Sequence, residues 1–326
     1  MRKNITLAVN YLLGPILFLL LTMVLYRQLI QQPDLEIRWS HLRASLTDPR
    51  LILVVLLMTL NWGLETVKWQ RLAAPIQTMS FLTAYQSVLA GCSITLLTPN
   101  RTGEFGGRIL WIRPEGRSRA VSAAILGSMS QLSVTFLAGT TALFWVDWQQ
   151  ITGGLSVKMP GLSRTGLLLL SGMVALLLVF LFFRIRQLPD YLKRIGFPER
   201  WLRYLSVLEA YSGKDLLRIS LYSALRYMVF ILQYMLILDV MDVRIAPVTA
   251  IPLLAVFFLM LALVPTLAFT ELPLRSLASL LVLRQYSDNT LGIQASALGI
   301  WLINILFPAL LGALLMLRVR VFKTTA

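Results

Sequence analysis

The chain has 326 residues, of which 57% are hydrophobic and 14% are charged, and its mean hydropathy is +0.73. Soluble globular domains are about 45–50% apolar and about 25% charged, so this chain lacks the polar surface that a soluble fold of its length needs. The composition argues against a soluble enzyme, a nucleic-acid-binding domain and a secreted disulfide scaffold. It indicates an all-α integral membrane protein.

The charge balance is basic, with 30 Lys and Arg against 15 Asp and Glu. In a soluble protein this excess would suggest nucleic acid, but in membrane proteins basic residues gather in cytoplasmic loops, where they meet anionic lipid. We therefore expect the membrane and an anionic phospholipid or lipid-linked substrate as partners, and no nucleic acid. The single cysteine, Cys92, and the single histidine, His41, cannot build a metal site, and we expect no metal and no cofactor.

The apolar segments, taken in chain order, predict the membrane crossings. They cover residues 7–26, 51–70, 78–98, 120–146, 165–183, 217–239, 250–264 and 290–317. Most approach or exceed the roughly 20 residues that cross a bilayer core, but 250–264 ends at Pro265 and is too short to cross comfortably. The first segment has no small-residue cleavage site, so we expect an uncleaved N-terminal helix rather than a signal peptide.

The charge distribution favours six full spans plus two re-entrant helical hairpins, at 78–112 and 250–284. With the N-terminus inside, this arrangement places most Lys and Arg in cytoplasmic segments, as the positive-inside rule requires. One such segment is the basic stretch 184–218, which we expect to form an amphipathic helix on anionic lipid. The chain 1–326 is then a single transmembrane domain in which span 165–183 links two halves.

The two halves have opposite orientations in this topology. The repeat units are about 51–146 and 217–317, and each consists of a span, a hairpin and a span. Inverted repeats with broken helices at matching positions are a recurrent design of secondary transporters, in which the binding site lies between the repeats. The sequence therefore predicts an inverted repeat.

A short motif occurs in both hairpins. Each copy has a proline, then a threonine, then a glutamate, and then an arginine four residues after the glutamate. The copies are Pro99, Thr102, Glu104 and Arg108, and Pro265, Thr270, Glu271 and Arg275. We expect each proline to end the entering arm and each threonine to cap the returning arm. The glutamate then lies in the first turn of that arm, with the arginine one turn later on the same face.

Charges at membrane depth point to a function, because each costs about 2.5–3.5 kcal/mol on insertion scales. We expect a phosphate-bearing head group to dock between the hairpin tips on Arg101, Arg108 and Arg275, since the guanidinium fork matches phosphate. Glu104 and Glu271 would hold these arginines or bind a cationic group on the lipid. The alternative is that each glutamate only neutralises its arginine and braces the hairpin.

Two spans carry further polar residues. Asn61, Glu65, Lys68 and Trp69 share one helical face of the second span. This face either lines a cavity, or Lys68 marks the cytoplasmic interface with Glu65 as its partner. Arg226 lies two turns inside span 217–239, where snorkelling to the interface is difficult, so we expect it to face the cavity.

The sequence contains no recognisable catalytic set and no nucleotide-binding loop. We therefore expect no catalytic residues and a protein that is not an enzyme. Two alternatives to a lipid translocator stay open. One is a membrane-embedded glycosyl- or aminoacyl-transferase component, for which Asp34 and Glu36 form the one outer acidic pair. The other is an ion-coupled transporter of a soluble solute.

The Pro99-to-Arg108 stretch, the Asn61-to-Trp69 face and the Pro265-to-Arg275 copy resemble the flippase-like transmembrane domain of bacterial lysylphosphatidylglycerol synthases. The resemblance covers about 7–320. It departs in the second copy, where Phe269, Pro273 and Leu274 replace the glycines that are common in the family.

This resemblance implies a multi-pass protein of the bacterial inner (cytoplasmic) membrane that moves or handles lipid-linked head groups. In two-part members a cytoplasmic aminoacyl-transfer domain follows the transmembrane domain. Because the sequence reaches Ala326 with no such domain, we expect this protein to be similar to the stand-alone members. The synthase activity is not carried over, and a separate biosynthetic enzyme is a candidate partner.

Overall fold

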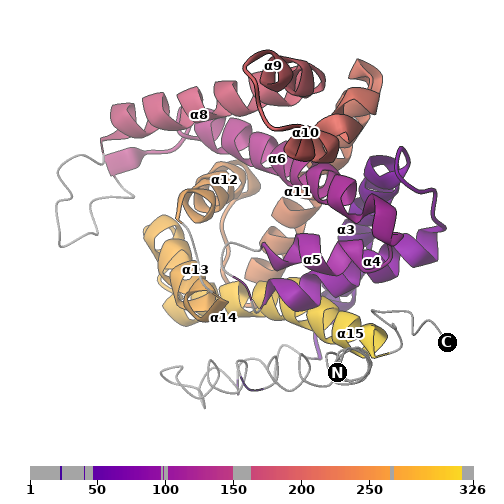
Figure 1. The fold of residues 1–326 in the computed structure, drawn as a ribbon. Coiled ribbons are helices and arrows are strands. Elements are labelled where there is room, and N and C mark those ends of the chain that lie inside the picture. The colour runs from indigo at the N-terminus through magenta and orange to yellow at the C-terminus, as the bar shows by residue number, and fades with distance from the viewer. Residues whose placement is uncertain are drawn as a thin grey trace.

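The computed structural model describes residues 47–96, 98, 102–149, 163–264 and 268–317, together with Met23 and Ser40. In this part of the chain every regular element is a helix (Figure 1). In chain order the helices are α3 (Arg50–Ala73), α4 (Phe81–Thr95), α5 (Gly103–Ile109), α6 (Arg117–Ala142), α8 (Arg164–Arg184), α9 (Leu188–Arg194), α10 (Glu199–Leu205), α11 (Gly213–Val240), α12 (Pro247–Leu263), α13 (Ala268–Leu283), α14 (Thr290–Trp301) and α15 (Phe307–Met316).

Five stretches of the described chain are long and apolar enough to cross a membrane. They are Arg50–Ala73, Pro114–Ala142, Arg164–Arg194, Gly213–Val240 and Thr290–Met316. The last of these runs through α14 and α15, which a π-helical turn at Leu302–Leu306 joins. These stretches coincide with five of the six predicted spans, and the predicted first helix, 7–26, lies outside the described residues except for Met23. The prediction of an all-helical, multi-pass membrane protein is confirmed.

Helices α3 and α11 form an antiparallel pair at the centre of the packing. Arg50, which begins α3, forms an ion pair with Asp239 near the end of α11. At the opposite end, the Nε of Arg71 donates to the Tyr222 hydroxyl at 3.2 Å. Arg50 also hydrogen-bonds to Asp48, and these bonds lower the pKa of the Asp48 carboxyl. The pair therefore has polar contacts at both ends, while apolar and polar side chains fill its middle.

Helices α4 and α5 are the two antiparallel arms of a tight hairpin. The arms approach so closely that a Cβ on Gly107 would lie 2.4 Å from the carbonyl oxygen of Ala90, so the position requires glycine. At the outer ends of the arms, the Gln77 amide donates to the carbonyl of Trp111 at 3.3 Å and accepts from the Arg113 amide at 3.0 Å. The chain therefore leaves this hairpin beside the point where it enters.

The predicted threonine caps of the returning arms are wrong. Thr102 precedes α5, but its side chain makes no capping bond, and Thr98 accepts from the Gly103 amide at 2.7 Å instead. In the second hairpin α13 begins at Ala268, so Thr270 lies within its first turn. The entering arms also end before the prolines, at Thr95 and Leu263. Pro99 and Pro265 themselves lie outside the described residues.

The hairpins pack across the molecule against the last spans of the opposite halves. Helix α4 packs on α15, and helix α12 packs on α6 (Figure 1). Both contacts depend on glycine: a Cβ on Gly312 would lie 2.0 Å from the carbonyl oxygen of Leu89, and one on Gly139 would lie 2.4 Å from the Cβ of Leu259. Small residues let membrane helices approach closely in this way.

The basic segment 184–218 is not the single helix that its composition suggests. It contains two short helices, α9 and α10, followed by a 3-10 turn at Ser206–Ala210 and the first turns of α11. Gly196 interrupts it with a φ of +78°, which side chains rarely tolerate, and Pro198 follows. The aromatic residues Trp201 and Tyr204 are exposed on α10.

Candidate functional site

Glu65 of α3 lies at the centre of a buried ion-pair network. Its Oε1 is 2.6 Å from an Nη of Arg108 on α5, and its Oε2 is 2.8 Å from the Nζ of Lys68 on α3. Its Oε2 also forms an ion pair with Arg226 of α11. The four residues are between 1% and 7% exposed. One carboxylate thus joins three cations from three helices, and we call this group, with Glu104, the Glu65 cluster.

Arg226 is held in the cluster from several sides. Its Nε donates to the Asn61 Oδ1 at 3.1 Å, and the Asn61 amide donates back to the Arg226 carbonyl at 3.2 Å. The Oε1 of Gln131, on α6, accepts from the Arg226 guanidinium at 3.4 Å. The guanidinium also lies 5.5 Å from the centre of the Trp62 ring, a distance suited to a cation–π contact. These contacts fasten the second half of the chain to the first.

Lys68 faces small residues of two neighbouring helices. Its Nζ lies 3.5 Å from both the Gly127 carbonyl and the Ser223 hydroxyl, which in turn accepts from Ser130 at 3.0 Å. The Lys68 side chain is 1% exposed. The predicted pairing of Lys68 with Glu65 is confirmed, and both positions of Lys68, in a cavity or at the cytoplasmic interface, stay predictions.

Arg108 connects the cluster to the first hairpin. It forms the predicted ion pair with Glu104 one turn earlier on α5, in addition to its bond to Glu65. The guanidinium lies 5.2 Å from the centre of the Trp69 ring. The Ser87 hydroxyl donates to the Arg108 carbonyl at 2.9 Å and accepts from the Trp69 indole at 3.0 Å, which orients both residues. Glu104 is the most accessible member of the cluster, with its side chain 27% exposed.

The charges of the cluster do not cancel. Lys68, Arg108 and Arg226 carry three positive charges, and Glu65 and Glu104 carry two negative ones. Moving an ion from water into the protein interior costs roughly several kcal/mol of desolvation free energy, even when the ion is paired. An excess cation is therefore unfavourable unless a further anion binds to it. The arrangement is therefore suited to an anion that approaches from the accessible side, at Glu104.

The second hairpin carries its own ion pair. The Nε and an Nη of Arg275 donate to Glu271 Oε1 at 3.1 and 3.0 Å, within the first turns of α13. The two side chains are 12% and 10% exposed. The predicted pairing within the motif is thus present in both hairpins.

The structure brings five of the eight predicted site residues into one network: Glu65, Lys68, Glu104, Arg108 and Arg226. It places Glu271 and Arg275 on the other hairpin. Arg101 lies outside the described residues.

Sequence reasoning missed Gln131, Ser130 and Ser223, which line the network from α6 and α11. The sequence feature that could have revealed them is the placement of polar and small residues on one face of an otherwise apolar span.

No group of three or more His, Cys, Asp and Glu that could hold a metal ion occurs among the described residues. The oxygen-rich clusters that bind hard cations are built from several carboxylates. In the Glu65 cluster, Lys and Arg outnumber the carboxylates, so these residues are unsuited to a metal cation.

Comparison with known proteins gives one clear relationship. The family model of the lysylphosphatidylglycerol synthase TM region matches residues 8–270. No curated protein and no solved structure matches the chain. The matched region contains α3, both arms of the first hairpin, α11 and α12, and therefore the whole Glu65 cluster, whereas Glu271 and Arg275 follow directly after it. The chain belongs to the lysylphosphatidylglycerol synthase transmembrane-region family.

Proposed function

We propose that this protein is a flippase-like translocator of a phosphate-bearing lipid in the bacterial inner membrane. The observation that carries the proposal is the excess of cations over carboxylates in the buried Glu65 cluster. Two of its cations are arginines, whose planar forks bind phosphate oxygens in pairs. Membership of a family of membrane regions named for lipid synthases supports a lipid substrate.

In this proposal the head group exchanges places with a carboxylate. Glu104 is the accessible partner of Arg108, and an arriving phosphate takes over that ion pair while Glu65 keeps the three cations together. Arg275 supplies a second docking point on the other hairpin. The acyl chains stay in apolar surroundings throughout, and the chain carries out no covalent step. Net direction then comes from a gradient, from consumption of the lipid on one side or from a partner enzyme.

The architecture supports an inverted repeat with two re-entrant hairpins. The outer ends of α4 and α5 are joined through Gln77, so this hairpin has the form of one that returns to the side it came from. The contacts of α4 with α15 and of α12 with α6 are counterparts under exchange of the two halves, and each centres on a glycine, Gly312 and Gly139. Transporters of this design bind their substrates between the repeats.

Cysteine labelling tests this topology. In a Cys92→Ala background, single cysteines at Ser80 and Arg113 should react with a membrane-impermeant maleimide from one side of the membrane. Cysteines at Arg244 and Arg284 should react from the opposite side, because the second hairpin is inverted. All four positions are exposed, so access to the reagent is limited only by the membrane. Labelling of Ser80→Cys and Arg113→Cys from opposite sides would show that the first hairpin crosses the membrane.

Head-group binding tests the function. Arg108→Gln should weaken binding of phosphatidylglycerol, measured by native mass spectrometry, by about tenfold or more, because charged hydrogen bonds contribute about 1.5–3 kcal/mol each. Arg108→Lys should restore part of the affinity, since a point charge replaces the fork. Arg71→Gln is the matched control: this arginine is exposed and pairs with a tyrosine.

The bracing alternative gives a different result. If Arg108 serves only to neutralise Glu104, a Glu104→Gln/Arg108→Gln double variant leaves no mismatched charge in that pair and should bind phosphatidylglycerol as the wild type does. In our proposal the double variant stays defective. Full binding by the double variant would contradict the assignment of Arg108 to the head group.

A further inference from the structure

The basic segment 184–218 presents exposed aromatic and cationic side chains after the end of α8. Its large apolar side chains on α9, α10 and the turn between them are 39–63% exposed: Tyr191, Ile195, Phe197, Trp201 and Tyr204. Exposed cations lie beside them in the chain: Arg184, Arg186, Lys193, Arg194, Arg200 and Arg203. We call these two sets together the α9–α10 surface. Large apolar side chains beside cations are typical of helices that lie at a membrane surface.

Buried residues fix this segment to the end of the bundle. Val207 and Leu208, in the 3-10 turn that follows α10, are 4% and 3% exposed. The hydroxyl of Tyr211 donates to the carbonyl of Leu72 near the end of α3, and α10 packs against α6 (Figure 1). The aromatic side chains thus stay exposed although the segment that carries them is packed against the bundle.

The two ends of the bundle differ in charge. At the end that carries the α9–α10 surface, twelve Lys and Arg stand against five Asp and Glu, counted over residues 71, 113–119 and 184–218. At the opposite end, four Arg stand against five Asp, counted over the described residues 48–50, 147, 164, 239–244 and 284–288. Opposite charges attract across a surface in this way, so the first end alone is suited to an anionic partner.

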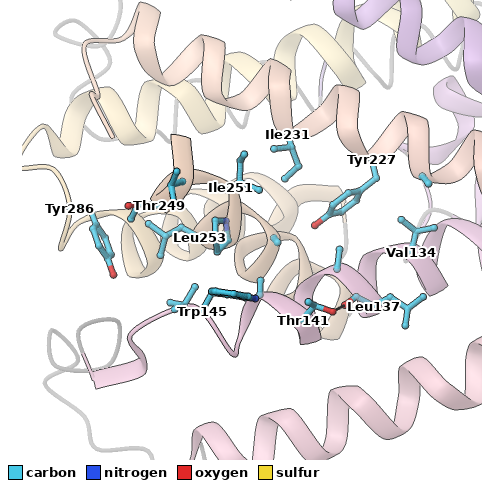
Figure 2. A pocket seen from close by; sticks show the side chains of 17 residues that line it. Val134, Leu137, Thr141, Trp145, Tyr227, Ile231, Thr249, Ile251, Leu253 and Tyr286 are labelled. Carbon is cyan, nitrogen blue, oxygen red and sulfur yellow. Dashed lines mark hydrogen bonds between the residues drawn. The ribbon is translucent and has the colours of Figure 1, made fainter. Parts of the chain in front are cut away.

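Aromatic side chains occur at the opposite end of the bundle as well. Trp145 and Tyr286 line an apolar groove there, between α6, α11 and α12 (Figure 2). The Trp145 side chain is 79% exposed. Trp and Tyr are enriched at both membrane–water interfaces, so aromatic residues do not distinguish the two ends. The α9–α10 surface differs from the opposite end by its cations.

We propose that the α9–α10 surface binds the head groups of anionic lipids in the bilayer beside it. The exposed apolar side chains of α8, such as Phe180 and Phe183, lead directly into this surface, so the bilayer that covers α8 also adjoins α9 and α10. The Arg200 guanidinium lies 5.7 Å from the centre of the Trp201 ring, which brings a cation and an interfacial aromatic group together. Cations near an anionic leaflet bind its head groups. An acidic protein would match the cations, but the continuity with α8 favours lipid.

A fluorophore on the full-length protein in vesicles tests this interaction surface. In the Cys92→Ala background, Trp201→Cys carries a polarity-sensitive fluorophore, and the protein is reconstituted into phosphatidylcholine vesicles with and without phosphatidylglycerol. The fluorescence should rise with phosphatidylglycerol, because the anionic head groups draw the surface into less polar surroundings. Raising the salt concentration from about 0.1 M to about 1 M should reverse the rise, since the screening length falls from about 10 Å to about 3 Å.

Matched variants at the two ends identify the cause of the rise. Arg200→Gln/Arg203→Gln should remove most of it, because each cation at an anionic surface favours binding about fivefold. Arg244→Gln/Arg284→Gln removes two exposed cations from the opposite end and should leave the rise unchanged. The same fluorophore on Trp145→Cys, an exposed aromatic position of that end, should show no rise with phosphatidylglycerol.

The opposite results would overturn the proposal. Equal fluorescence of the Trp201→Cys label in both kinds of vesicle would show that anionic lipid does not bind there, and an acidic protein would then be the better match for the cations. A rise that Arg200→Gln/Arg203→Gln retains in full, or one that Trp145→Cys shows equally, would contradict a surface whose cations bind anionic head groups.

Discussion

Replacing Glu65 with Gln should destabilise the protein by about 3–5 kcal/mol, the usual cost of breaking a buried ion pair and leaving its partner charge uncompensated. The expected effect is large because Glu65 is 2% exposed and joins Lys68, Arg108 and Arg226. An amide of the same size keeps the packing but removes the negative charge from among three cations. The measurement is the midpoint of thermal unfolding in detergent, together with the yield of folded protein.

Glu104→Gln is the matched control, since it makes the same chemical change in the same network. Its side chain is 27% exposed and pairs with Arg108 alone among the cluster cations, so solvent compensates much of the loss. We expect a destabilisation of about 1 kcal/mol or less, as for other partly exposed pairs. If the two variants unfold at the same temperature, Glu65 is not the centre of the cluster.

Arg226→Gln should abolish lipid translocation with a smaller effect on stability. Glu65 keeps Lys68 and Arg108 as partners in this variant, so no buried carboxylate is left unpaired. We expect the substitution to reduce the rate of translocation instead, because Arg226 is the cation that the second half of the chain contributes to the cluster. Arg226→Lys should recover little, since a lysine cannot bond to Glu65 and Asn61 through a planar fork. The rate of translocation in reconstituted vesicles is the measurement.

The long apolar helices could be predicted from sequence because a bilayer imposes length and apolarity on any crossing helix. Local pairs could be predicted for a similar reason. Glu65 with Lys68, and Glu104 with Arg108, are three and four residues apart and must meet on a helix surface. The same rule gave Glu271 with Arg275. Helix geometry alone settles these three local pairs.

The convergence of Arg108 and Arg226 on Glu65 could not be predicted, although each residue was singled out. These pairs are 43 and 161 residues apart, and the rotation of each helix about its axis decides whether they meet. That rotation depends on glycine contacts such as Gly107 against Ala90, which no periodicity reveals.

The geometry of the loops could not be predicted from sequence patterns either. The prediction of a cap at Thr102 is wrong because the hydroxyl of Thr98, before the hairpin tip, accepts the hydrogen bond from the Gly103 amide instead. The prediction of a single amphipathic helix at 184–218 is wrong because Gly196, with a φ of +78°, interrupts the helical backbone between α9 and α10. Both outcomes depend on backbone angles at a few residues rather than on the composition of a segment.

Translocation by the purified wild-type protein tests the central claim most directly. Vesicles that contain phosphatidylglycerol with a fluorescent acyl chain are treated with a membrane-impermeant reducing agent, which bleaches only the outer leaflet. We predict that wild-type protein, and the Arg71→Gln control, expose the inner pool to bleaching, whereas Arg226→Gln leaves it protected. An inner pool that stays as protected with wild-type protein as in protein-free vesicles, or one that Arg226→Gln exposes as fast as the wild type, would contradict a lipid translocator built around the Glu65 cluster.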